Sequence, residues 1–164
     1  MRVVRIVCYG LCCCLASPLL QSCSYGIATP TIETKSALEM QAMQVREFNC
    51  TKEQGLTAII SMFQDLGYTV EQIESTAGLV MAKTPSKATW VLGRGAVTKW
   101  AKATGFVEPI SDGRTRIRLS FVNSEMVDGY HMQSTNEARV EDPNFYQNAF
   151  ALLHKAIFVR SNTQ

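Results

Sequence analysis

The chain has 164 residues, of which 16 are Lys or Arg and 14 are Asp or Glu, giving a formal net charge of +2. This length predicts one domain and excludes a large multidomain enzyme. Arg2 and Arg5 supply the positive excess, because no acid precedes Glu33, so the chain without residues 1–22 is neutral. A neutral domain lacks the basic surface of nucleic-acid-binding proteins and is not an acidic disordered tail, so we expect no nucleic-acid partner.

The first 22 residues have the order of parts found in a secretion signal. Arg2 and Arg5 precede a mostly apolar stretch of 15 residues, Ile6–Leu20. This stretch is shorter than the roughly 20 residues of a membrane-spanning helix. It ends in Leu20-Gln21-Ser22-Cys23, which resembles the lipobox of bacterial lipoproteins, in which a small residue precedes the cysteine.

The lipobox resemblance implies a lipid anchor. A diacylglycerol group would be attached to the sulfur of Cys23, and the chain would be cleaved after Ser22. Two or three acyl chains hold a domain on a membrane without a spanning helix. Ser24 stands where an Asp would favour the inner membrane. We therefore expect an outer-membrane anchor with the domain facing the periplasm, and the inner membrane is the alternative. An ordinary cleaved signal or an uncleaved anchor is the competing interpretation.

The other cysteines predict no further chemistry. Five of the six cysteines lie in the first 23 residues and only Cys50 lies in the body, which excludes a disulfide framework there. Cys12–Cys14 lack the spacing of zinc ligands, and His131 and His154 are far apart, so we expect no metal and no cofactor. Cys50 is predicted to be a packed structural cysteine rather than a reactive thiol.

Small and polar residues dominate residues 24–40, and Pro30 interrupts them. This composition predicts a tether, with a short helical turn near Ser36–Met40. The expected organisation is a signal peptide at 1–22, a lipidated N-terminus and tether at 23–43, and a single α+β domain at 44–164.

The first half of the domain predicts a strand at Gln44–Asn49, followed by a helix. Thr51 and Gln54 have the spacing of a capping box, and apolar residues then recur every three or four positions up to Gly67. Two further segments predict the strands of a hairpin: Tyr68–Glu74 and Leu79–Lys83.

The second half begins with an ambiguous segment, residues 84–96. A strand is then predicted over Val97–Val107, limited by Pro109. After the Asp112-Gly113 turn, Thr115–Asn123 alternates between apolar and polar side chains, which predicts a strand with one face on the core. The apolar members of this strand are Ile117, Leu119 and Phe121.

Residues 124–141 predict either a loop or an irregular hairpin. Asp142-Pro143 then begins a helix that runs to about Val159. Its apolar face is predicted to contain Phe145, Ala149, Leu152, Leu153, Ala156 and Ile157. The fold class expected from this order is α+β, an antiparallel sheet with two helices packed on one face.

The body resembles a family of small, uncharacterised Gram-negative envelope lipoproteins. The resemblance covers most of residues 44–158, and Trp90–Trp100 departs from it. It rests on five segments: Gln44–Phe48, Gln64–Tyr68, Leu79–Lys83, Thr115–Leu119 and Asp142–Gln147. The resemblance implies an envelope lipoprotein and carries no catalytic residues. The order of elements is also similar to the helix-grip domains of an accessory lipoprotein of outer-membrane β-barrel assembly, a likeness of fold only.

No motif predicts catalytic residues. The segment Gly93–Lys99 lacks the four residues between glycines that a phosphate-binding loop requires, which favours a glycine-containing bend. A single histidine such as His131 does not define a nucleophile–base pair, and a surface-loop histidine is the simpler interpretation. His154, near the apolar face of the last helix, is expected to be structural or exposed.

Arg114, Arg116 and Arg118 are the best candidates for binding a partner. Their spacing of two places them on one face of a strand, with Lys99 and Lys102 predicted on the neighbouring strand. Such a stripe could meet an anionic lipid, a glycan or an acidic protein. Cross-strand acids that neutralise a solvated face are the alternative. Trp90 and Trp100 are either interface anchors or core aromatics.

We therefore expect a membrane-anchored, non-enzymatic periplasmic lipoprotein, a binding or assembly module within an envelope protein complex. One alternative is a periplasmic carrier of a small apolar ligand, which requires a cavity between the last helix and the sheet. The other is a small hydrolase acting on glycan or lipid, which requires convergent titratable groups.

Overall fold

A computed structural model describes residues 35–129 and 133–161 of the chain. In chain order its elements are α1 (Ala37–Gln44), β1 (Val45–Phe48), α2 (Lys52–Asp65), β2 (Thr69–Glu74), β3 (Leu79–Lys83), β4 (Lys87–Val91), β5 (Gly95–Ser111), β6 (Arg114–Asp128), β7 (Gln133–Arg139) and α3 (Pro143–Ser161). The signal peptide, Cys23, Ser24 and His131 lie outside the described residues, so their predicted roles are not visible here.

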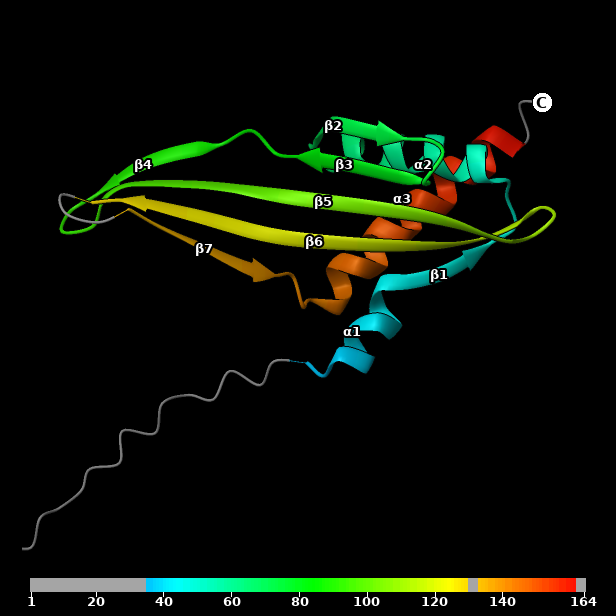
Figure 1. Ribbon diagram of the computed structural model, residues 1–164, viewed down its shortest axis with the longest axis horizontal. Helices are drawn as coiled ribbons and strands as arrows, with labels where there is room; N and C mark the ends of the chain where they lie inside the picture. Colours follow the sequence, from blue (N-terminus) through cyan, green and yellow to red (C-terminus); the bar gives the residue numbers. More distant parts are fainter. Residues whose placement is uncertain (1–34, 130–132, 162–164) are drawn as a thin grey trace, which may run out of the picture. The chain divides into compact units, whose positions relative to one another are not determined.

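A long hairpin formed by β5 and β6 organises one antiparallel sheet (Figure 1). Toward the β5–β6 turn, β3 pairs with β5 and β1 pairs with β6, and β2 extends the sheet beyond β3. At the other end of the hairpin, β4 pairs with β5 and β7 pairs with β6. The α+β class with an antiparallel sheet is confirmed, and the sheet is larger than the sequence indicates.

Short sequence motifs correctly predicted where several helices and turns begin. Thr51 caps α2, and its side chain and that of Gln54 form the reciprocal bonds of a capping box. The β5–β6 turn contains Gly113 at a φ of 74°, which a glycine adopts without steric cost. At the start of α3, the backbone N–H of Asn144 donates to the side chain of Asp142 over 2.9 Å.

The core lies between the sheet and the helices α2 and α3. The alternating face of β6 is fully buried, as predicted, and its Phe121 ring contacts Phe63 of α2 and Tyr146 of α3, with centroid separations of 6.1 and 5.5 Å. The buried side chains of α3 are Tyr146, Ala149, Phe150, Leu153 and Ile157. Tyr146 and Phe150 were not among the residues predicted for this face. These side chains pack toward the sheet, in the place where a carrier of an apolar ligand would need its cavity.

Pro109 does not end its strand, contrary to the sequence prediction. β5 continues to Ser111, and the register shifts between Pro109 and Ser111. The N–H of Val107 donates to the carbonyl of Gly78, the residue before β3. Position 109 faces the same side as position 107 and lies beyond Leu79, the first residue of β3, so no bond to β3 requires the N–H that proline lacks.

Two segments without a firm sequence prediction are ordered. Of the segment 124–141, residues 124–128 form the end of β6 and residues 133–139 form β7, which pairs with β6 as the hairpin alternative requires. Residues 37–44 form α1, which begins at a Ser36–Glu39 capping box and spans the end of the predicted tether (23–43) and the first residue of the predicted domain. Met40 of α1 is buried, and Gln44 donates to the hydroxyl of Tyr146 over 3.2 Å. Among the described residues, no helix is long and apolar enough to cross a membrane.

A glycine in the middle of β5 lets α2 approach the sheet closely. A methyl group on Gly105 would lie 2.7 Å from Cγ2 of Ile59, a fully buried side chain of α2. Ile59 is β-branched and stiff about χ1, so it cannot easily turn away.

We predict that Gly105→Ala lowers the free energy of unfolding by about 1–3 kcal/mol, the usual cost of overpacking. Urea denaturation followed by circular dichroism measures this loss. The double variant with Ile59→Ala, which removes the clashing methyl group, should lose less than the sum of the two single variants. Additive losses would show that this contact does not limit the packing.

Candidate functional site

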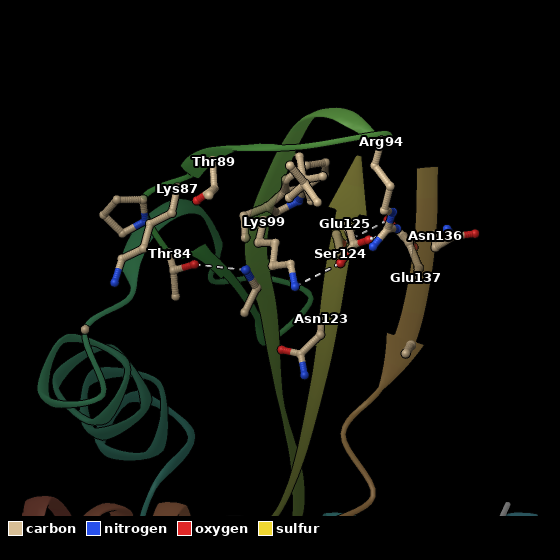
Figure 2. Close-up of a pocket in the computed structure, with 17 residues that line it drawn as sticks. Thr84, Lys87, Thr89, Arg94, Lys99, Asn123, Ser124, Glu125, Asn136 and Glu137 are labelled. Atoms are coloured by element: carbon tan, nitrogen blue, oxygen red, sulfur yellow. Dashed lines mark hydrogen bonds and ion pairs between the residues drawn. The ribbon is translucent and has the colours of Figure 1, made fainter. Parts of the chain in front are cut away.

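A hollow of about 1050 Å³ lies over the end of the sheet that β4 and β7 complete (Figure 2). Its floor is formed by four adjacent strands in the order β4, β5, β6, β7. Gly67, which follows α2, and Thr84-Pro85, which connect β3 to β4, border its helix-covered end. The hollow is therefore the continuation, beyond the helices, of the face that carries the core.

One row of side chains crosses this floor. Lys87 is opposite Lys99, Lys99 is opposite Glu125, and Glu125 is opposite Asn136, each in the register of its strand pair. Directly opposite residues project to the same face with Cβ atoms about 5 Å apart. The register therefore brings four polar side chains from four strands into one line.

Glu125 holds two of the cations at this site. Nζ of Lys99 is 3.0 Å from Oε2 of Glu125, and Nη2 of Arg94 is 2.8 Å from Oε1. The hydrogen bond from Lys99, followed by that from Arg94, holds the pKa of Glu125 below its ordinary value. Figure 2 shows Lys99 turned toward Glu125 and Arg94 reaching it from the β4–β5 turn.

Lys87 forms no ion pair with a described residue, although it lines the same hollow. Two neutral polar groups also line the hollow, the hydroxyl of Thr84 and the side-chain amide of Asn123, and both can donate a hydrogen bond to a ligand. The Oγ1 of Thr84 accepts from the backbone N–H of Ala101 over 2.9 Å, so its own proton is free to donate. The side chain of Asn123 has no described hydrogen-bond partner and lies close to the Lys99 ammonium group in Figure 2.

The opposite face of the same strands has its own balanced charges. Lys102 of β5 lies on that face and contacts Glu137 of β7 with an N–O distance of 2.6 Å. This contact is the main cause that lowers the pKa of Glu137. Lys99 and Lys102 therefore do not share one basic face, since they project to opposite sides of β5.

The predicted tryptophan anchors lie at this end of the sheet. Trp90 of β4 is 64% exposed. Trp100 borders the hollow and carries Lys83 5.2 Å from the centre of its ring. Its indole N–H is buried with no acceptor among the described residues. Trp90 is thus no core aromatic, whereas Trp100 is mostly covered.

The predicted arginine stripe lies far along β6 from the hollow. Arg114 and Arg116 contact Glu47 of β1, with N–O distances of 3.5 and 3.1 Å, and Arg116 is 3.6 Å from Glu108 of β5. Arg118 forms no ion pair with a described residue. The arrangement of Arg114 and Arg116 matches the alternative of cross-strand neutralisation, and their binding of a partner stays a prediction.

The remaining sequence candidates have structural surroundings. Cys50 is buried, its sulfur lies 2.9 Å from the hydroxyl of Thr115, and burial raises the pKa of the thiol, as expected for a packed cysteine. His154 is exposed on α3, and its ring lies 6.5 Å from that of Phe48.

The glycine-containing bend predicted near position 94 is confirmed. Gly93 and Gly95 have φ values of 81° and 87°, and the N–H of Arg94 donates to Val91 across the turn between β4 and β5. Within residues 35–129 and 133–161, no group of three or more His, Cys, Asp or Glu side chains is placed to hold a metal ion.

Comparisons with known proteins identify no family. No protein-family model matches the chain, and no curated protein is significantly similar to it. A solved structure with some likeness is a TBP-like protein from Parabacteroides distasonis, at 13% identity over 69% of this chain and 90% of that one, with a TM-score of 0.35. A TM-score this low does not establish a shared fold.

Sequence reasoning missed most of the hollow. It singled out Trp90, Trp100 and Lys99, but not Lys87, Thr84, Asn123 or Glu125. The signal that would have found them is a change from apolar to polar residues along one face of β5 and β6. The face of β6 that carries Leu119 and Phe121 continues as Asn123 and Glu125, so a polar site follows directly after a core segment.

We predict that Lys99→Met raises the pKa of Glu125 toward its ordinary value, and that Arg94→Met raises it less. Because the folded-state pKa is lowered, this contact stabilises the protein above the ordinary glutamate pKa and is lost as pH falls through the lowered value. NMR titration of the Glu125 carboxyl carbon measures the shift. Lys102→Met is the matched control, since it should move Glu137 and leave Glu125 unchanged. An equal response of Glu125 to Lys99→Met and Lys102→Met would contradict the assignment.

Proposed function

We propose that this protein is a lipid-anchored, non-enzymatic lipoprotein of the bacterial envelope, whose domain binds a partner on the periplasmic side of the outer membrane. The anchor is inferred from Arg2, Arg5, the apolar stretch Ile6–Leu20 and the lipobox-like end at Cys23. The observation that supports the binding role is the hollow over β4–β7, a concave surface beyond the helices that combines apolar side chains such as Val91 and Val97 with a row of charged and polar groups.

The carboxylates of the hollow favour binding over hydrolysis. A general acid works near neutral pH only when its pKa is raised. The pKa values of Glu125 and Glu137 are instead lowered by their lysine partners, so both groups are ionised and engaged. A glycan or lipid hydrolase would need a group free to transfer a proton, and these two carboxylates do not supply it.

A first experiment tests the anchor. The protein purified from membranes of its native host should begin at Cys23 and carry the mass of acyl chains, whereas Cys23→Ala should retain residues 1–22. Intact-mass spectrometry measures both. Cys14→Ala, a cysteine in the same apolar stretch outside the lipobox, is the matched control and should be processed normally. An unmodified N-terminus, or normal processing of Cys23→Ala, would overturn the lipoprotein assignment.

A second experiment tests the binding role. A photo-crosslinking amino acid at position 123, in the hollow, should form adducts with an envelope component in living cells. The same amino acid at position 104, on the opposite face of β5, should form few, because Thr104 projects away from the hollow. Equal crosslinking from both positions would remove the hollow as the specific binding surface.

A further inference from the structure

The charges that line the hollow do not balance. Its charged members are Lys87, Arg94, Lys99, Glu125 and Glu137. Glu137 is neutralised by Lys102 from the opposite face at 2.6 Å. Three cations then face one carboxylate, which leaves an excess of two positive charges. The sheet places Lys87 directly opposite Lys99, and like charges in that position destabilise a strand pair.

The ammonium groups of Lys87 and Lys99 lie on different sides of Thr84 in Figure 2. Figure 2 shows Lys99 turned toward Glu125 and Lys87 extending along the other side of the hollow, with Thr84 between them. The free proton of the Thr84 hydroxyl and the side-chain amide of Asn123 add hydrogen-bond donors without described acceptors. Three cations and two neutral donors that share the single carboxylate of Glu125 leave positive charge and hydrogen-bond donors for a bound anion.

We propose that the hollow binds a phosphate monoester group, held between Lys87 and Lys99 and hydrogen-bonded by Thr84 and Asn123. This rests on the proposed function, since it names the ligand class of the same binding surface. A phosphate monoester carries a charge of about −1.5 to −2 at pH 7, which matches the excess of two positive charges better than a single carboxylate does. The contacts come from side chains, unlike those of a glycine-rich phosphate loop, which uses backbone N–H groups.

The size of the hollow indicates that phosphate is one part of a larger ligand. A volume of about 1050 Å³ is at the upper end of small-molecule sites and far exceeds one phosphate group. The rest of the ligand would lie over the row toward Asn136. A soluble phosphate monoester and the headgroup of phosphatidic acid share this chemistry, and the experiment separates them.

The test is calorimetric titration of the mature protein in a nonionic detergent with glycerol 3-phosphate. We expect saturable binding at pH 7.5 that weakens at pH 5, where the monoester loses one charge, since its second pKa is about 6. Lys87→Gln should weaken binding by about tenfold, the effect of losing one charge-assisted contact. Lys155→Gln, the same charge change on the exposed surface of α3, should leave it unchanged.

A second pair of variants separates local contact from general charge. Asn123→Asp should abolish binding, whereas Asn136→Asp, on the other side of Glu125, should weaken it by no more than about threefold. Circular dichroism confirms that each variant is folded. Phosphatidic acid vesicles, compared with phosphatidylcholine vesicles, form the second arm: binding to glycerol 3-phosphate assigns a soluble ester, and binding only to phosphatidic acid, lost in Asn123→Asp, assigns a lipid headgroup.

Binding in neither arm, or equal binding by Lys87→Gln and Lys155→Gln, would overturn the phosphate assignment. Such a result with an acylated Cys23 and crosslinking from position 123 would leave the proposed function standing and remove only the ligand class. Loss of crosslinking from position 123 would instead remove the binding surface itself.

Discussion

The close approach of α2 to β5 is the contact on which the rest of the structure depends. Gly105 and Gly55 lack side chains where the helix meets the strand, so the side chains of Ile59 and Val107 pack almost against backbone. This approach fixes α2 over the part of β5 that pairs with β3. A hydrogen bond of 2.8 Å between Arg160 and Ser61 joins α3 to the same helix. Both helices therefore cover one half of the long hairpin and leave the other half open.

The boundary of helix cover is also the boundary between core and site. On β5 the helix-facing side chains change from Val107 and Ala103 to Lys99, and on β6 they change from Phe121 to Asn123. The same two strands thus carry apolar residues where α2 and α3 cover them, and they carry Lys99, Asn123 and Glu125 beyond these helices. Because β5 and β6 are packed into the core at one end, their backbones position Lys99 and Asn123 at the other end.

The sequence predicted elements whose signals are local or whose burial is strong. The Thr51 cap, the alternation around Phe121 and the Asp142 helix start all fall in these classes. β4 and β7 were not predicted with confidence because they are exposed along nearly their whole length and so lack the alternation that marks a half-buried strand. The hollow could not be predicted because it depends on pairing between distant positions, such as Lys99 with Glu125.

The two ends of the long β5–β6 hairpin also differ in the free energy needed to separate their strands. At the helix-covered end, separating the strands exposes fully buried side chains such as Phe121. At the other end, β4 and β7 are held by backbone pairing and exposed charges, so local opening there costs much less free energy. The strands β4 and β7 can therefore open locally while the core stays intact.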